Sequence, residues 1–115
     1  MRYLCLIYRD EAALAATPTP DREKMTAEYA AFSESVRKSG HLLGGDALQP
    51  AGTSTVVRVR DGRTSTTDGP FIETKEQLGG YYLFQAKDLN EAIQLSARIP
   101  GARSGSIEVR PIREM

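Results

Sequence analysis

Two short runs are apolar at every position, and they constrain the fold more than any other feature of the chain. Residues 3–8 read YLCLIY and residues 81–84 read YYLF. A strand with one face in water alternates apolar and polar side chains, whereas a strand covered on both faces is apolar throughout. We therefore expect a sheet in which these two runs are the central strands.

The segment after the first run predicts a loop over residues 9–17 and then a helix. Thr19 followed by Pro20 is a typical helix start, and Gly40 is a typical residue just past a helix end. Between them, apolar residues recur every three or four positions and predict one buried stripe. That stripe consists of Met25, Tyr29, Phe32 and Val36.

The middle of the chain predicts strands. Residues 41–48 read as a short strand with a Gly-Gly bulge, and residues 55–60 alternate before Asp61-Gly62, a pair typical of a two-residue type I′ hairpin that returns through residues 63–67. Residues 80–86 and 106–112 predict two further strands.

Between these last two strands, a capping-box pattern at residues 88–91 predicts a second helix, which ends at Pro100-Gly101. Its expected inner face consists of Leu89, Ala92, Ile93, Ser96 and Ala97.

This order of strand, helix, strand, inserted hairpin, strand, helix and strand predicts an α+β, ferredoxin-like βαββαβ fold. Right-handed crossovers place the first and third core strands at the centre of the sheet and both helices on one face. The other face then presents apolar side chains without a helix to cover them. We expect a second copy of the chain to cover it in a homodimer.

Composition limits the classes of function. The chain has 115 residues, which predicts one domain over residues 1–115, and its 15 basic and 15 acidic residues argue against a nucleic-acid partner. Cys5 is the single cysteine, so an internal disulfide and a thiolate zinc site are excluded, and within an apolar run it is expected to be a buried, unreactive thiol rather than a nucleophile. No stretch predicts a signal peptide or a membrane span, so we expect a cytoplasmic protein without a membrane partner.

The stretch DGPFIETKEQLGG at residues 68–80 fits the pattern of a regular helix or strand less well than any other part of the chain. Asp68 precedes Gly69-Pro70, and because proline has no N–H the usual turn bond from the Asp68 carboxylate is unavailable. Phe71 is expected to be a buried anchor that orients Asp68. The spacing of Thr74 and Gln77 fits a capping box and predicts one short helical turn that ends at Gly79-Gly80.

The same stretch resembles the signature of the DGPF branch of the YCII-related proteins, and residues 107–112, IEVRPI, resemble that family's closing strand. The resemblance runs over the whole chain. It implies a ferredoxin-like domain that pairs into a dimer of the α/β-barrel type, often encoded beside extracytoplasmic-function sigma factors, and it implies no established activity. Related members have a helix histidine proposed to work with an aspartate; Tyr29 stands nearest to that position here, so that dyad does not carry over.

Several residues are candidates for chemistry. Asp68 and His41, the only histidine, are the most natural acid–base pair, although His41 directly after a helix can instead interact with the negative end of that helix. Candidate ligand-binding residues are Tyr8, Arg58, Glu73 and Lys75.

Other positions allow two interpretations. Arg2, Arg9, Arg58 and Arg60 could bind an anionic ligand or could protect sheet edges from aggregation. Gly79-Gly80 could form an anion-binding nest or could mark only the passage from loop to strand.

The sequence is compatible with three functions. The first is a small-molecule-binding protein with an acid–base site at Asp68, and no pattern in the chain predicts a cofactor. The second is a non-enzymatic regulatory or interaction module associated with an extracytoplasmic-function sigma factor. A haem or quinol monooxygenase is the third, with His41 as the only imidazole able to ligate haem.

Overall fold

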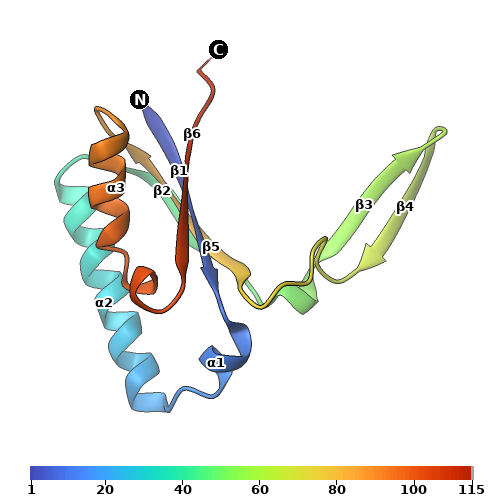
Figure 1. Ribbon diagram of the computed structural model, residues 1–115, viewed down its shortest axis with the longest axis horizontal. Helices are drawn as coiled ribbons and strands as arrows, with labels where there is room; N and C mark the ends of the chain where they lie inside the picture. The colour runs from blue at the N-terminus through green and yellow to red at the C-terminus, as the bar shows by residue number, and fades with distance from the viewer. Residues whose placement is uncertain (115) are drawn as a thin grey trace.

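The computed structural model describes residues 1–114 (Figure 1). Six strands, three α-helices and two 3-10 turns follow one another along this part of the chain. Their order is β1 (Arg2–Arg9), α1 (Glu11–Ala15), α2 (Thr19–Lys38), β2 (Leu42–Ala47), η1 (Ala51–Thr53), β3 (Thr55–Arg60), β4 (Arg63–Asp68), β5 (Gln77–Gln85), α3 (Leu89–Ala97), η2 (Pro100–Arg103) and β6 (Ser106–Pro111).

Four strands form one antiparallel sheet in the order β2-β5-β1-β6. The two fully apolar runs are therefore its central strands, as their lack of alternation predicts. The topology agrees with the expected α+β, ferredoxin-like fold. Strand β2 also has a bulge, but at Leu43 and not at the expected Gly44-Gly45 pair, because the register shifts between Leu42 and Gly44.

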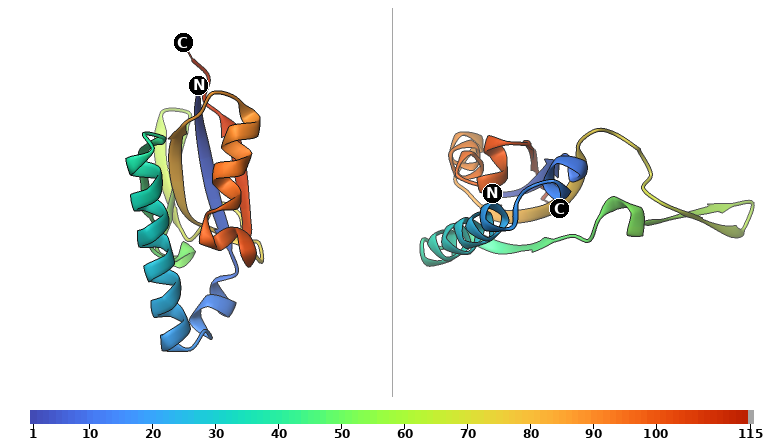
Figure 2. Two further views of the ribbon diagram at one scale, coloured as in Figure 1. Left: turned by 90° about the vertical axis from the view of Figure 1, so that its left-hand side faces the viewer. Right: turned by 90° about the horizontal axis from the view of Figure 1, so that it is seen from below.

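Helices α2 and α3 cover one face of the sheet (Figure 2). From β1, every second side chain enters the core beneath them, namely Tyr3, Cys5 and Ile7. An aromatic cluster fills the space between α2 and β5: the Phe32 ring packs edge-on at 5.3 Å from Tyr82 and 6.1 Å from Phe84. Offset and edge-on rings pack well, so this cluster fixes α2 on the sheet.

The opposite side chains of the central strands form what we call the open face: Leu4, Leu6 and Tyr8 of β1 with Tyr81 and Leu83 of β5. In the cross-strand register Leu4 pairs with Leu83 and Leu6 with Tyr81. These side chains are only partly buried, and α2 and α3 lie on the other side of the sheet. The expectation that helices would cover only one apolar face is confirmed.

Strands β3 and β4 form a separate two-stranded hairpin that we call the arm (residues 55–68). Asp61 and Gly62 at its tip have φ angles of 51° and 73°, as a type I′ turn requires. Figure 1 shows the arm reaching out on the side of the sheet opposite α2 and α3. Because of it, the radius of gyration is 16.0 Å, against about 13 Å for a compact chain of this length.

Phe71 corrects the most important expectation from the sequence. Its side chain is 72% exposed, so it does not anchor Asp68 in the core. It lies in the segment between β4 and β5, where its ring stands 5.7 Å from Arg58 Cζ of the arm. The helical turn expected at residues 74–77 is absent as well, because the Thr74 hydroxyl donates to Glu76 O and the chain enters β5 at Gln77.

Three other local expectations need correction. Residues 9–17 do not form a plain loop, because Asp10 caps α1 by accepting from Ala13 N. Helix α2 begins at Thr19, with Pro18 at the cap position and no side-chain capping bond there. The inner face of α3 is Ala92, Leu95 and Ser96, whereas Leu89, Ile93 and Ala97 are exposed.

Candidate functional site

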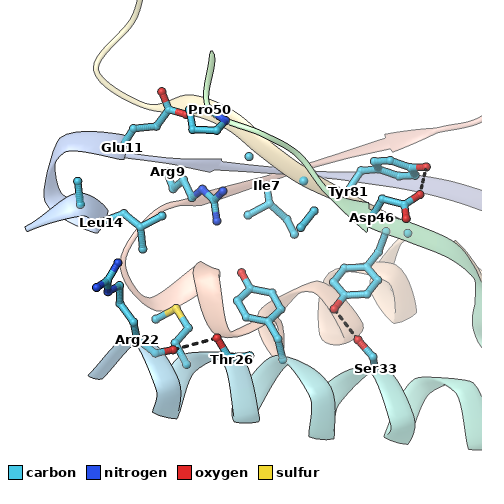
Figure 3. A pocket seen from close by; sticks show the side chains of 18 residues that line it. Ile7, Arg9, Glu11, Leu14, Arg22, Thr26, Ser33, Asp46, Pro50 and Tyr81 are labelled. Carbon is cyan, nitrogen blue, oxygen red and sulfur yellow. Dashed lines mark hydrogen bonds between the residues drawn. The ribbon is translucent and has the colours of Figure 1, made fainter. Parts of the chain in front are cut away.

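A cavity of about 620 Å³ lies between α1, the N-terminal half of α2 and the helix-facing side of the sheet (Figure 3). This volume is within the range of about 300–1,000 Å³ typical of small-molecule sites. Its apolar residues come from β1, α1, α2 and β5, and its charged residues come from β1, α1, α2 and β2. The apolar residues include Ile7, Leu14, Met25, Tyr29 and Tyr82; the charged residues are Arg9, Glu11, Arg22 and Asp46.

Arg9 enters this cavity from the last position of β1, and Figure 3 shows its guanidinium pointing inward. The strand pairing shifts at this point: Ile7 pairs with Gly80 and Tyr8 with Leu78, so Gly79 is the extra residue of a bulge in β5. The Arg9 side chain lies directly over Gly79. A methyl group there would lie 2.8 Å from Arg9 Cζ and closer still to Nε, so only glycine leaves room for this conformation.

Arg9 Nε is buried, and within residues 1–114 no protein atom accepts a hydrogen bond from it. The two acidic residues that line the cavity, Glu11 and Asp46, have other partners. Glu11 Oε2 accepts from Ala51 N at 2.9 Å, and Asp46 Oδ2 accepts from the Tyr81 hydroxyl at 2.9 Å. The Asp46 bond raises the pKa of Tyr81, so its hydroxyl stays protonated and donating.

Two tyrosine hydroxyls line the floor between α2 and the sheet. The Tyr29 hydroxyl accepts from Gly101 N at 3.1 Å, and Ser33 Oγ and the Tyr82 hydroxyl are hydrogen-bonded at 2.7 Å. Burial raises the pKa of Tyr29, so its phenol keeps its proton at neutral pH.

The two residues expected to form an acid–base pair have different surroundings in this chain. Asp68 is the last residue of β4 at the base of the arm, where it pairs with Thr55 and is exposed. His41 directly precedes β2; its Nδ1 lies 2.7 Å from Ser39 Oγ and its Nε2 lies 3.3 Å from Glu91 Oε1. The structure thus does not bring Asp68 and His41 into contact within one chain, and neither lines the cavity.

The four candidate ligand-binding residues are also dispersed. Tyr8 lies on the open face, where its hydroxyl donates to Glu108 Oε1 at 3.4 Å. Arg58 lies on the arm beside Phe71, and Glu73 and Lys75 are exposed in the segment before β5. None of the four is among the residues that line the cavity.

The sequence did not predict most cavity residues as site residues, because their pattern has an ordinary structural explanation. Tyr29 and Met25 belong to the apolar stripe of α2, which predicts core packing, and Arg22 reads as a solvated helix residue. Arg9 was a candidate for anion binding and does enter the cavity. The Gly79-Gly80 pair lies within β5, and only the fold shows that Gly79 is close to Arg9, because the two residues are far apart along the chain.

Comparison with known proteins agrees with this architecture. The family model for the YCII-related domain matches residues 1–115. The chain belongs to the YCII-related family. It is also 34% identical over 114 residues to an uncharacterized protein of Rhizobium meliloti (strain 1021), in an alignment that covers 97% of this chain and 92% of that protein.

The family assignment confirms the resemblance seen in the 68–80 stretch and names no reaction. Within residues 1–114, no helix of this YCII-related chain combines the length and apolar character needed to cross a membrane.

Proposed function

We propose that this YCII-related protein binds a small organic molecule in the cavity between α1, α2 and the sheet. The observation that carries the proposal is a cavity of about 620 Å³ into which the partly buried Arg9 side chain points, with a buried Nε that has no hydrogen-bond acceptor among residues 1–114. A concave, mainly apolar space with a few convergent polar groups is the usual form of a ligand site.

The distribution of polar groups supports binding rather than simple packing. A buried polar group normally has a hydrogen-bond partner, because leaving it unpaired costs about 1–3 kcal/mol. The cavity retains the Arg9 donor while its neighbouring carboxylates bond elsewhere. A bound molecule that supplies an acceptor would remove this cost.

A blocked-cavity variant tests the proposal. Met25→Trp places a larger apolar side chain in the cavity, and Lys24→Trp places the same ring at the neighbouring exposed position as the control. A metabolite library is screened by thermal shift against the wild type, and each stabilising compound is mapped by NMR. Hits should perturb Ile7 and Tyr29 and should be lost in Met25→Trp alone. If no compound stabilises the wild type, or if the hits map elsewhere, the cavity is not a ligand site.

A homodimer through the open face accompanies this proposal. The open face presents Leu4, Leu6 and Leu83 from the centre of the sheet, and contiguous apolar surface of this kind usually marks an interface. The arm gives independent support: an isolated two-stranded hairpin is marginally stable in water, yet Val57 and Val59 are 60% and 58% exposed on one of its faces. A second chain between arm and open face would cover both surfaces.

Sedimentation of two matched variants tests the dimer. Leu6→Glu puts a charge at the centre of the open face, whereas Leu89→Glu puts it on the exposed first residue of α3. At micromolar concentration the wild type and Leu89→Glu should sediment as dimers and Leu6→Glu as a monomer. A wild type that is monomeric throughout would remove this proposal.

A second candidate function, a protein-interaction module, is favoured by the exposed arm. For such a module the family resemblance suggests a link with an extracytoplasmic-function sigma factor. In the same view an acid–base role of Asp68 depends on a second chain or a ligand at the base of the arm, because its carboxylate is exposed in the single chain. Loss of turnover in Asp68→Asn, with unchanged binding in the cavity, would support that role.

A further inference from the structure

The geometry points to an organic anion as the occupant of the cavity, with Arg9 binding its carboxylate or phosphate head and the apolar walls holding its body. This inference rests on the proposed function, because it names the chemical class of the molecule bound there. Its starting observation is again Arg9 Nε, buried without a protein acceptor in the described part of the chain.

Arginine carries a permanent positive charge in proteins, and the Nε of the Arg9 guanidinium is buried at the cavity. Its planar group carries donors in a fork that matches the two oxygens of a carboxylate or phosphate. Glu11 and Asp46 are the acidic residues that line the cavity, but Glu11 is bonded to Ala51 N, and the Asp46 carboxylate is bonded to the Tyr81 hydroxyl on the open face. Within residues 1–114, the buried Nε of Arg9 therefore has no carboxylate as a hydrogen-bond partner.

Hydrogen-bond donors outnumber free acceptors beside Arg9. The Tyr29 hydroxyl already accepts from Gly101 N, and no atom of residues 1–114 accepts its proton. Arg9 and Tyr29 thus both offer hydrogens to the cavity. A ligand that complements them must present acceptor oxygens.

Gly79 leaves the space that Arg9 occupies. It has no positive φ angle, so an alanine there would suit the backbone, and the three atoms nearest to its new methyl group would all belong to the Arg9 side chain. The bulge in β5 and the glycine together hold the guanidinium in its inward position. Bulges commonly redirect a side chain beside a functional site.

The apolar walls of the cavity indicate what the body of the ligand is. Ile7, Leu14 and Met25 line the same cavity from three different elements, and they offer no hydrogen bonds to a second polar group. A small inorganic ion would leave these walls uncovered. The best complement is therefore an amphipathic molecule with one anionic end.

Four probes of similar size test the assignment by NMR titration: 4-phenylbutanoate, its neutral primary amide, phenyl phosphate and 3-phenylpropylamine. We expect the carboxylate or the phosphate to bind at least about tenfold more tightly than the amide, since a charge-assisted hydrogen bond to arginine exceeds a neutral one by that order. Resonances of Ile7, Met25 and Tyr29 should report the binding. The stronger of the two anions identifies the head group.

Two variants link the preference to Arg9. Arg9→Met keeps the length of the side chain and should abolish the preference for the anion while the amide binds as before; Arg60→Met removes the same charge from the arm and should change neither. Gly79→Ala keeps the charge but displaces the guanidinium, so it should weaken anion binding even if Arg9→Met does not fold.

The outcomes separate this inference from the proposed function. If the amide binds in the cavity as tightly as the anions, or if the preference survives in Arg9→Met or, where that variant does not fold, in Gly79→Ala, the anion assignment is wrong and the cavity remains a site. If none of the four probes perturbs the lining residues of the wild type, both proposals are overturned.

Discussion

Phe84 and Phe71 provide a matched pair, because the same substitution should have very different effects at the two positions. Phe84 is 0% exposed and stacks on Tyr82 with 5.4 Å between ring centroids. Phe71 is 72% exposed, and its ring makes a cation–π contact with Arg58. Phe84→Ala should therefore destabilise the protein strongly and Phe71→Ala only weakly.

The magnitudes follow from burial. Truncating a buried phenylalanine to alanine costs about 3–5 kcal/mol, including the cavity that it leaves. An exposed cation–π contact contributes about 0.5–1 kcal/mol. For 115 residues the entropy of unfolding is about 0.24 kcal/mol/K. The melting temperature should thus fall by about 12–21 °C in Phe84→Ala and by about 2–4 °C in Phe71→Ala.

Thermal melts followed by circular dichroism measure both shifts, and they should be repeated over a hundredfold range of protein concentration. Equal losses in the two variants at the lowest concentration would refute the reasoning, because Phe71 would then have to pack in the core of its own chain. A Phe71→Ala loss that appears only at high concentration would instead place this ring at an interface between chains.

Four further predictions concern single positions. Cys5 should react with thiol reagents only as fast as the protein unfolds, because it is buried and burial raises the pKa of its thiol; rapid labelling of native protein would contradict this. Asp88→Ala should cost about 1 kcal/mol in urea unfolding, since Asp88 Oδ1 accepts from Glu91 N at the start of α3, and an unchanged midpoint would show that the cap contributes nothing. Gly105→Ala should cost about 1–3 kcal/mol because its new methyl group would meet the backbone oxygen of Tyr8, whereas Gly44→Ala has nothing within 4 Å and should be close to neutral; equal melting temperatures would contradict the packing around Gly105. Asp68→Asn should shift stability by less than about 0.5 kcal/mol, as expected at an exposed position, and a larger loss would reveal a structural bond to this carboxylate.

The features that were predictable from the sequence depend on neighbours close along the chain. Apolar runs identified the two central strands, and Asp61-Gly62 specified the turn of the arm because both residues must adopt positive φ. Glu91 N donates a hydrogen bond to Asp88 Oδ1, as the three-residue spacing of the two residues predicts. Such signals act over a few residues, so they are present before any tertiary contact.

The errors occurred where a local rule competed with packing. Phe71 is a large apolar residue and was expected to be buried, but it lies in the segment that joins β4 of the arm to β5 and its side chain is exposed. Thr74 and Gln77 have the spacing of a capping box, yet pairing of β5 with β1 reaches Gln77 and competes with a helical turn at that end. Strand pairing engages these residues from a distant part of the chain, which no local pattern records.

By itself, the sequence determined the fold class, the order of the strands, the turn of the arm and the family. Only the tertiary structure decided where the candidate site lies. The Arg9 guanidinium enters the cavity because a bulge brings Gly79 beneath it, and Tyr29 meets Gly101 across the same space. These pairs are far apart along the chain, and side-chain periodicity carries information only about residues within a turn or a strand of one another. The site therefore forms only when the strands have assembled into the sheet.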